Sequence, residues 1–256
     1  MRCGRSQGAP VAGSHEMDGR AHIRVAANRS GRDFFLGDLH GMYDAFLTAL
    51  AARDFDPARD RVFSVGDLVD RGPDSGRCLA LLEEPWFHAV RGNHEQMMID
   101  VLLGGEDAGL WRLNGGGWFA ESERATLVCR LRRLLPHLPL ALTVDLSDGG
   151  RIGICHAEYP RLDWDEVESA IGISPDRHRM LWGREILAHA LERKVAHATL
   201  TLHGHTPLPA PRRLGNALFI DTGLVYGGPV PLFTLDELRE VARPAIQPSV
   251  AAASKR

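Results

Sequence analysis

Three short apolar segments of this sequence each run into a glycine that is followed by an acidic or amide residue. The segments are residues 33–36, 61–65 and 86–90, and the pairs that follow them are Gly37-Asp38, Gly66-Asp67 and Gly92-Asn93. Apolar residues at helical spacing come after each pair, as in Tyr43, Phe46 and Leu50. This β-α-β-α-β-α succession predicts parallel strands joined by right-handed crossovers.

Asp38, Asp67 and Asn93 therefore lie just past the carboxyl ends of successive predicted strands. In an open α/β sheet this edge is where ligands bind. The glycine before each residue lets the backbone turn sharply and approach a ligand closely. For any one of the three residues, an ordinary turn is the commoner explanation. Their repetition at successive strands favours a shared site.

The second half of the chain predicts a further, partly antiparallel sheet. Expected strands cover residues 140–146, 151–155, 198–202, 217–220 and 231–235. Mostly helical segments are expected at residues 107–135, with a break at Gly115-Gly116-Gly117, and at residues 163–193. The histidines His156 and His205 again follow short strands. A lone histidine in such a place is more often a buried core residue than a ligand, so their role depends on the whole set.

The domain is expected to span residues 33–240. Residues 1–32 mix Gly, Ser, Arg, Ala and Asn without sustained periodicity and predict a disordered N-terminal tail, or a start codon placed before Met17. Residues 241–256 predict a disordered C-terminal tail. The 256 residues are 44% hydrophobic and 25% charged, which suits one large globular domain.

Several classes of protein are disfavoured. The net charge of −3 gives no footprint of a nucleic-acid binder. The four cysteines are far apart, which argues against a zinc knuckle or a disulfide framework. No apolar run approaches the roughly 20 residues needed to cross a bilayer, and the N-terminus has no apolar signal-peptide core. A cytoplasmic, reduced protein without membrane or nucleic-acid partners is the prediction, and the oligomeric state stays open.

The candidate ligands are oxygen and imidazole groups without thiolate. His40 follows Asp38 by two residues, so both can face one cation. Such donor sets suit Mn²⁺, Fe or Zn²⁺ at a working site better than a purely structural cysteine site.

The sequence resembles the phosphoprotein phosphatase family of calcineurin-like metallophosphoesterases, in the branch of the phage lambda serine/threonine phosphatase and its bacterial relatives. The segments that carry the resemblance are 37–41 (GDLHG), 66–72 (GDLVDRG), 91–95 (RGNHE), 114–118 (NGGGW), 154–157 (ICHA), 204–207 (GHTP) and 221–223 (DTG). The likeness extends from about residue 33 to residue 235. It implies a four-layer αββα sandwich of two mixed sheets flanked by helices.

The resemblance also implies roles for individual residues. One divalent metal would be held by Asp38, His40 and Asp67, and a second by Asp67, Asn93, His156 and His205. The metals would be Mn²⁺ in the first instance, with Fe or Zn²⁺ as alternatives. Arg71, Arg91 and Arg184 would bind the phosphoryl oxygens. His94 would be the general acid, oriented by Asp70.

Three functions remain open at this point. The first is a serine/threonine protein phosphatase acting on phosphoproteins or phosphopeptides through a metal-activated water. The second is a nucleotide phosphohydrolase, similar to a diadenosine tetraphosphatase or an RNA-end pyrophosphatase. The third, a catalytically silent scaffold, is disfavoured because the six ligand positions and His94 are all present.

Overall fold

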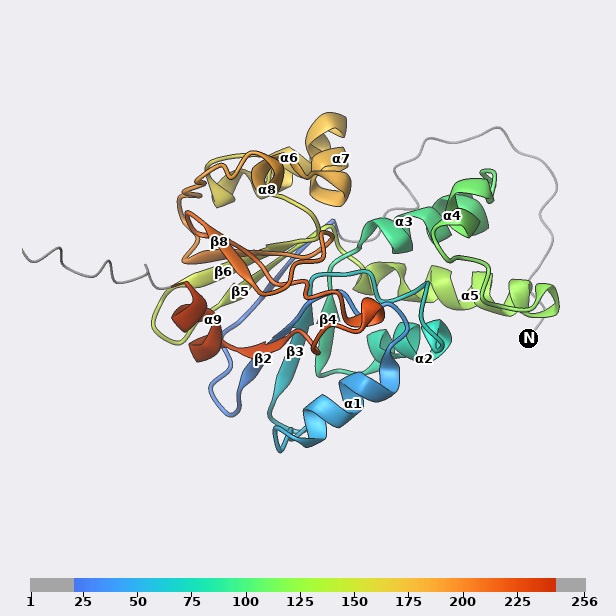
Figure 1. Cartoon of the computed structure of the whole chain (residues 1–256), viewed down its shortest axis with the longest axis horizontal. Helices are drawn as coiled ribbons and strands as arrows, with labels where there is room; N and C mark the ends of the chain where they lie inside the picture. The colour runs from blue at the N-terminus through green and yellow to red at the C-terminus, as the bar shows by residue number, and fades with distance from the viewer. Residues whose placement is uncertain (1–20, 243–256) are drawn as a thin grey trace, which may run out of the picture.

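The computed structural model of the protein describes residues 21–242, which form two mixed β-sheets with helices on their outer faces (Figure 1). The four-stranded sheet has the order β10 (Leu232–Thr234), β2 (Asp33–Leu36), β3 (Arg61–Ser64), β4 (Phe87–Ala89). The six-stranded sheet has the order β1 (His22–Val25), β5 (Ala141–Asp145), β6 (Arg151–Cys155), β7 (Leu200–His203), β9 (Ala217–Phe219), β8 (Arg212–Leu214).

The predicted parallel unit is confirmed. Strand β2 pairs parallel to β3, and β3 pairs parallel to β4. In the other sheet β6, β7 and β9 are parallel to one another, whereas β5 runs antiparallel to β6. Because parallel strands end at the same edge, each sheet presents several carboxyl ends side by side.

The two sheets pack face to face around an apolar core. In β2, Phe35 points toward the second sheet, while its neighbours Phe34 and Leu36 point toward the helices, as the period of two in a strand requires. Ile152 and Ile154 of β6 enter the same inter-sheet core from the opposite side. Each of these side chains is fully buried.

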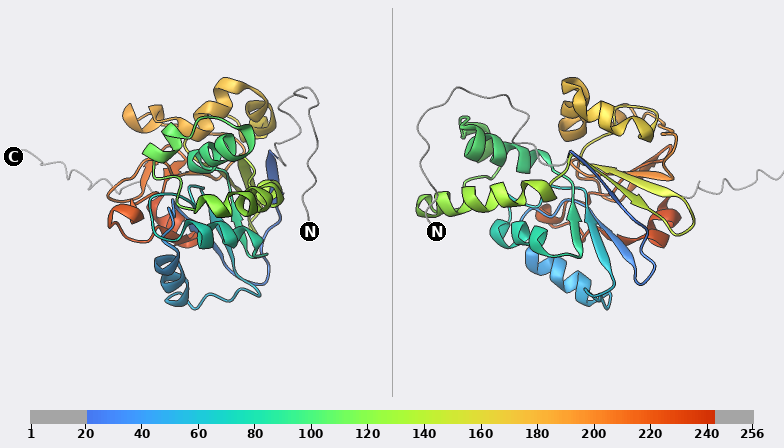
Figure 2. Two further views of the ribbon diagram at one scale, coloured as in Figure 1. Left: turned by 90° about the vertical axis from the view of Figure 1, so that its right-hand side faces the viewer. Right: turned by 180° about the vertical axis from the view of Figure 1, so that it is seen from behind.

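Helices complete the two outer layers. They are α1 (Tyr43–Ala51), α2 (Ser75–Ala80), α3 (Asn93–Ile99), α4 (Gly109–Leu113), α5 (Arg124–Leu134), α6 (Val167–Gly172), α7 (Ser174–Trp182), α8 (Glu185–Ala188) and α9 (Leu235–Val241). Short 3₁₀ turns cover Leu81–Glu83, Glu121–Glu123, Leu135–His137, Trp164–Glu166 and Leu224–Tyr226, and a π-helical turn, Asp100–Gly104, extends α3. Residues of α1, α2, α3 and α5 pack on the four-stranded sheet, and α6 and α7 pack on the six-stranded sheet. The four-layer αββα prediction is thus confirmed. Figure 2 shows α4 and α5 extending beyond the sheets.

The described structure includes a strand before residue 33, the predicted start of the domain. Strand β1 lies upstream of it and pairs parallel to β5 across residues 22–25. Arg24 fixes this strand further, because its guanidinium donates to both carboxylate oxygens of Asp145. The strand is only four residues long, and its two apolar side chains, Ile23 and Val25, are only partly buried against the inter-sheet core, which gives a short and weak apolar pattern. Residues 1–20 and 243–256, which are parts of the predicted tails 1–32 and 241–256, lie outside the described residues, and α9 reaches residue 241.

A second difference is β8, a three-residue edge strand that the sequence did not predict. Its first two residues are the partly exposed Arg212 and Arg213, so no apolar run marks it. Within residues 21–242, no helix is long and apolar enough to span a membrane.

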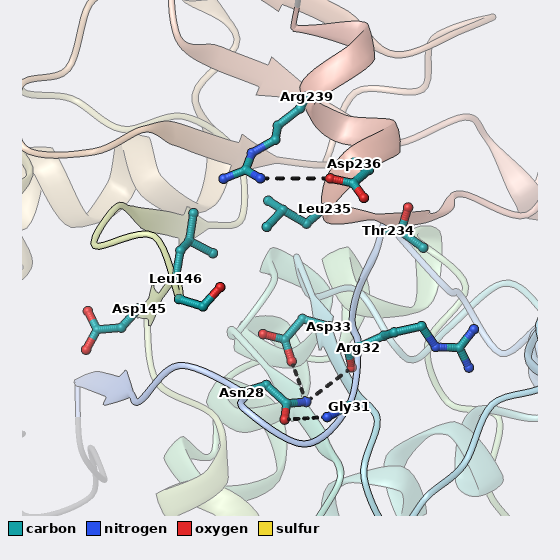
Figure 3. Close-up of a pocket in the computed structure, with 11 residues that line it drawn as sticks. Asn28, Gly31, Arg32, Asp33, Asp145, Leu146, Thr234, Leu235, Asp236 and Arg239 are labelled. Carbon is teal, nitrogen blue, oxygen red and sulfur yellow. Dashed lines mark hydrogen bonds and ion pairs between the residues drawn. The ribbon is translucent and has the colours of Figure 1, made fainter.

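A cleft opens at the amino ends of the parallel strands, between the loop before β2, the end of β5 and α9 (Figure 3). Its charged side chains already have partners within the protein: Arg32 with Asp60, Asp33 with Arg61, Asp145 with Arg24, and Arg239 with Asp148. None of the predicted site residues lines this cleft.

Candidate active site

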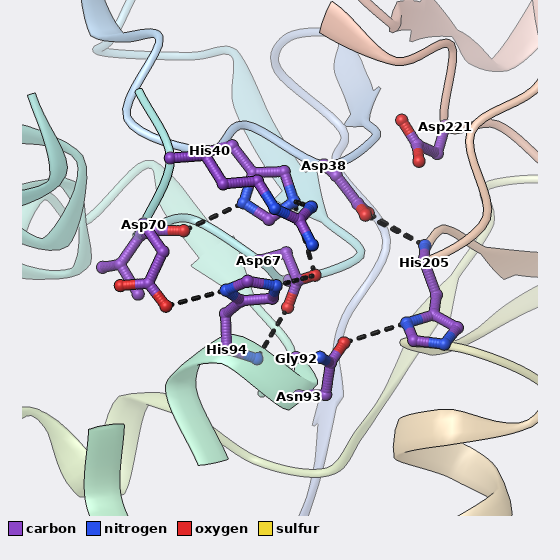
Figure 4. A network of polar contacts seen from close by, with 12 residues as sticks. Asp38, His40, Asp67, Asp70, Gly92, Asn93, His94, His205 and Asp221 are labelled. Carbon is purple, nitrogen blue, oxygen red and sulfur yellow. Dashed lines mark hydrogen bonds and ion pairs between the residues drawn. The ribbon is translucent and has the colours of Figure 1, made fainter. Parts of the chain in front are cut away.

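The predicted site residues meet at the opposite edge, past the carboxyl ends of the strands (Figure 4). The four-stranded sheet contributes Asp38 after β2, Asp67 after β3 and Asn93 after β4. The six-stranded sheet contributes His156 after β6 and His205 after β7. All five side chains are buried, with 7% exposure or less. The fold therefore brings residues up to 167 positions apart into one polar cluster beneath the surface.

Asp67 lies at the centre of this cluster. Its Oδ2 atom is 3.4 Å from Nε2 of His156 and 3.6 Å from Nε2 of His40. Two groups of potential metal ligands share this aspartate: His40 and His94 on one side, and His156 and His205 on the other. Asp67 is therefore the one carboxylate that belongs to both groups.

Backbone carbonyl groups set the orientation of two histidine rings. Nδ1 of His156 lies 2.8 Å from the carbonyl oxygen of Val65, and Nδ1 of His40 lies 2.9 Å from that of Val69. In each ring Nδ1 donates its hydrogen, and Nε2 points into the cluster. This second hydrogen bond is how proteins fix the tautomer of a metal-ligating imidazole.

Asn93 completes the side of the cluster toward the six-stranded sheet. Its Oδ1 atom is 2.9 Å from Nε2 of His156 and 2.9 Å from Nδ1 of His205. Burial acts to lower the pKa of His156, but the carboxylate of Asp67, with the Val65 carbonyl and Glu95, outweighs burial and raises this pKa above its ordinary value. The buried negative charge of the cluster therefore favours a positive charge at this point, which a bound divalent cation would supply.

Asp38 adds a second buried carboxylate. Its oxygens accept the backbone N–H of His205 at 3.0 and 3.2 Å. Burial raises its pKa well above the ordinary value, and the neighbouring carboxylates Asp221 and Asp67 act in the same direction. Three carboxylates crowded into one buried site need compensating positive charge. This donor set of oxygens and imidazoles fits divalent metal ions.

The backbone of the site is held in an uncommon conformation. Five of its non-glycine residues have positive φ angles: His40 (44°), Asp67 (49°), Asp70 (73°), Arg71 (68°) and His205 (69°). Such conformations cost of order 1–3 kcal/mol each and persist where the surrounding structure imposes them. These positive φ angles are concentrated at this edge of the sheets. We infer that the loop backbone adopts them to hold the side chains of the site in position.

Glu95 is a supporting residue that the sequence analysis did not assign. It is fully buried, and its carboxylate accepts the backbone N–H groups of residues 67, 68, 69 and 92. These contacts join the loop after β3 to the loop after β4. Burial, with Asp67 nearby, raises the pKa of Glu95 to about 7. A glutamate three residues after the helix N-cap Gly92 is a capping-box pattern that predicts part of this role.

His94 and Asp70 form a buried pair beside the ligand cluster. Nδ1 of His94 lies 2.7 Å from Oδ2 of Asp70. Nε2 of His94 faces the cluster, 3.9 Å from Oδ2 of Asp67, and has no hydrogen-bond partner among residues 21–242. The imidazole can therefore hold a proton at Nε2 and present it to a group bound in the site.

The three arginines take different positions. Arg71 and Arg184 are exposed at the rim, where a guanidinium nitrogen of Arg71 lies 2.5 Å from Nε2 of His40. Nε of Arg184 donates to Nε2 of His205 at 3.1 Å. Arg91 is buried and donates to Oε1 of Gln96 and to the carbonyl oxygen of Leu138. The exposed pair thus flanks the ligand cluster, whereas Arg91 is buried against α3 and Leu138.

Comparison with known proteins agrees with this geometry. The sequence profile described as "Calcineurin-like phosphoesterase" matches residues 34–233. Serine/threonine-protein phosphatase 1 of Salmonella typhimurium is 38% identical over 211 residues, which cover 82% of this chain and 94% of that protein. The asymmetrical bis(5'-nucleosyl)-tetraphosphatase of a Geobacillus species is 27% identical, covering 84% of this chain and 95% of that protein.

A solved structure shows the same fold. The cold-active protein-tyrosine phosphatase of a psychrophilic Shewanella species superimposes with a TM-score of 0.54, at 15% identity, over 91% of this chain and 84% of that chain. Fold and site together define an enzyme that hydrolyses phosphoesters with the help of bound metal. The chain belongs to the calcineurin-like phosphoesterase family.

Proposed function

We propose that this enzyme is a serine/threonine protein phosphatase that cleaves phosphomonoesters on phosphoproteins or phosphopeptides. The observation that carries the proposal is the buried His94–Asp70 pair beside two ligand groups that share Asp67. A proton donor next to a metal cluster suits an ester whose leaving oxygen is strongly basic, as a serine or threonine oxygen is.

Two divalent ions, Mn²⁺ in the first instance, are proposed as cofactors. Asp38, His40 and Asp67 would hold one ion, and Asp67, Asn93, His156 and His205 the other. When bound, the ions supply Lewis acidity and lower the pKa of water, so that attack on phosphorus becomes feasible at neutral pH.

The remaining roles belong to side chains of the chain itself. Arg71 and Arg184 would bind the phosphoryl oxygens from the rim, because planar guanidinium groups match phosphate geometry. Arg91, buried and tied to Gln96, would add positive charge. His94 would protonate the departing oxygen from Nε2 while Asp70 keeps the ring in place.

The choice of a protein substrate rests on similarity. The Salmonella relative named as a serine/threonine phosphatase is 38% identical, compared with 27% for the tetraphosphatase. Both cover most of the chain, so a nucleotide phosphohydrolase is the second candidate. The loops that select the substrate vary most between relatives, so overall identity alone does not decide between the two substrates.

The test compares initial rates on a phosphoserine peptide, diadenosine tetraphosphate and 5'-triphosphate RNA, each with Mn²⁺ or with a chelator. We expect hydrolysis of the peptide to be fastest and to disappear with the chelator. Preference for the dinucleotide or the RNA end would replace the substrate assignment. Undiminished turnover in the chelator would refute the metal-dependent mechanism.

A further inference from the structure

The carboxylate of Asp70 receives two hydrogen bonds besides that from His94, and both come from tryptophan. Nε1 of Trp111 lies 2.9 Å from Oδ2, and Nε1 of Trp118 lies 2.9 Å from Oδ1. Asp70 itself is fully buried. Three donors therefore surround one carboxylate, and both of its oxygens are held.

The chemical nature of these donors matters. An indole N–H is neutral and can only donate. It stabilises an ionised carboxylate and leaves the negative charge in place. An arginine or lysine would instead neutralise that charge. Burial raises the pKa of Asp70 above its ordinary value, and the hydrogen bonds from His94, Trp111 and Trp118 limit this rise. The two indole donors thus favour the charged form of the carboxylate that faces the imidazole of His94.

Both tryptophans belong to one segment, residues 109–119, which includes α4 and the glycine-rich loop after it. The loop passes so close to Trp111 that a Cβ atom on Gly116 would lie 2.3 Å from its Nε1. The carbonyl oxygen of Gly115 accepts the backbone N–H of Arg71 at 3.4 Å. Phe119 contacts both indole rings, with centroids 5.9 Å away in each case. The segment therefore packs around Asp70 and contacts the next residue, Arg71.

We propose that Trp111 and Trp118 are positioning residues for proton transfer: they fix the plane of the Asp70 carboxylate and thereby aim Nε2 of His94 at the leaving oxygen. This inference rests on the proposed role of His94. In the step concerned, a water oxygen bonds to phosphorus as the ester P–O bond breaks. The departing oxygen takes the proton from Nε2, one proton of the water stays on the phosphate that forms, and the other restores Nε2–H through solvent. The Nδ1–H group keeps its hydrogen bond to Asp70 throughout. Without the indole donors the carboxylate can rotate, and the imidazole follows it.

The experiment compares p-nitrophenyl phosphate with phenyl phosphate in the Mn²⁺-loaded full-length enzyme. The two esters are alike in shape, but phenolate is the more basic leaving group and depends more on protonation. We expect Trp118→Phe to lower kcat on phenyl phosphate about tenfold, within the range that general acids contribute, and to change kcat on p-nitrophenyl phosphate less than threefold. Trp111→Phe should act in the same direction.

Two controls separate positioning from damage to the fold. Trp164 is buried and donates its indole N–H to Thr143 at 2.8 Å, remote from Asp70, so Trp164→Phe should change both rates equally if it changes them at all. In a His94→Asn background, Trp118→Phe should cause no further loss, because its effect passes through His94. The partly exposed Trp118 keeps the test available if Trp111→Phe fails to fold.

Equal losses of kcat on the two aryl phosphates, or an additive loss in the His94→Asn background, would overturn the inference. The outcome is independent of the natural substrate, because neither ester resembles a protein or a nucleotide. Preference for a dinucleotide over a phosphopeptide would thus remove the proposed substrate and leave this inference standing.

Discussion

A Cβ atom built on Gly92 would lie 2.1 Å from Oδ1 of Asp67 and 2.4 Å from its backbone nitrogen. The φ of Gly92 is −88°, so any residue can adopt its backbone conformation. Space rather than flexibility therefore requires glycine here. The central aspartate reaches its position only because the neighbouring loop carries no side chain at this point.

Replacement of Gly92 tests this requirement. Gly92→Ala should displace Asp67 and lower kcat on p-nitrophenyl phosphate by about 10²-fold, since a shift of about 1 Å in a positioned group can cost that much. Gly76→Ala is the matched control, because Gly76 lies in α2 and its added Cβ would come no closer than 3.7 Å to Trp118. We expect this control to keep full activity and to gain roughly 0.5–1 kcal/mol in stability. Wild-type kcat in Gly92→Ala would contradict the steric argument.

At the scale of single residues, the sequence predicted positions better than contacts. Asp38, Asp67 and Asn93 could be placed at one edge because parallel strands end together. The three backbone amides of residues 67–69 on Glu95 and the two indoles on Asp70 could not, since they join residues distant in the sequence that no local pattern links. The metal-ligand roles of the predicted residues stay predictions.

At the scale of elements, strands with a fully buried apolar run were predictable, and short edge strands without one were not. Strand β6 was predicted at its observed bounds, because Ile152 and Ile154 alternate on one buried face. Strand β1 has no fully buried side chain, and β8 begins with two arginines. Such strands form because a neighbour offers hydrogen-bonding groups, and that information lies in the tertiary structure.

Asp60 immediately precedes β3 and links this strand to neighbouring loops by hydrogen bonds that affect stability at acidic pH. Its carboxylate accepts the backbone N–H and the guanidinium of Arg32, and the backbone N–H of Asp56. Burial acts to raise the pKa of Asp60, but these hydrogen bonds outweigh burial and lower it. A lowered pKa means that the stabilisation is complete well above the ordinary value of 3.8 and is lost as pH falls through the folded-state value.

Asp60→Asn should therefore lower the free energy of unfolding by about 1–3 kcal/mol at pH 7, because an amide cannot accept all of these donors. The difference from wild type should shrink as pH falls below about 4. Urea unfolding at several pH values measures both effects. Asp44→Asn removes an ion pair between exposed side chains and should change stability by less than about 0.5 kcal/mol. A pH-independent difference for Asp60→Asn would rule out ionisation as its source.

At the scale of the whole molecule, the site joins the two sheets. Asp67 and Asn93 come from the four-stranded sheet, His156 and His205 from the six-stranded sheet, and the inter-sheet core lies directly behind them. Separation of the sheets would therefore pull the ligand cluster apart. Occupancy of the site should in consequence stabilise the entire domain and not only its loops.

Metal binding then becomes visible in thermal unfolding. A ligand present at 100 times its dissociation constant stabilises the folded state by about 2.7 kcal/mol, which for a domain of this size corresponds to roughly 5–10 °C in Tm. We expect Mn²⁺ to raise the Tm of the wild type by this amount and a chelator to reverse the shift. Asp67→Asn should remove most of the shift, because it weakens both ligand groups, whereas Asp44→Asn should keep it. An equal Tm shift in Asp67→Asn and wild type would mean that the metal binds elsewhere. A metal held between the two sheets depends on the Asp67 carboxylate, so loss of that carboxylate must reduce its stabilising effect.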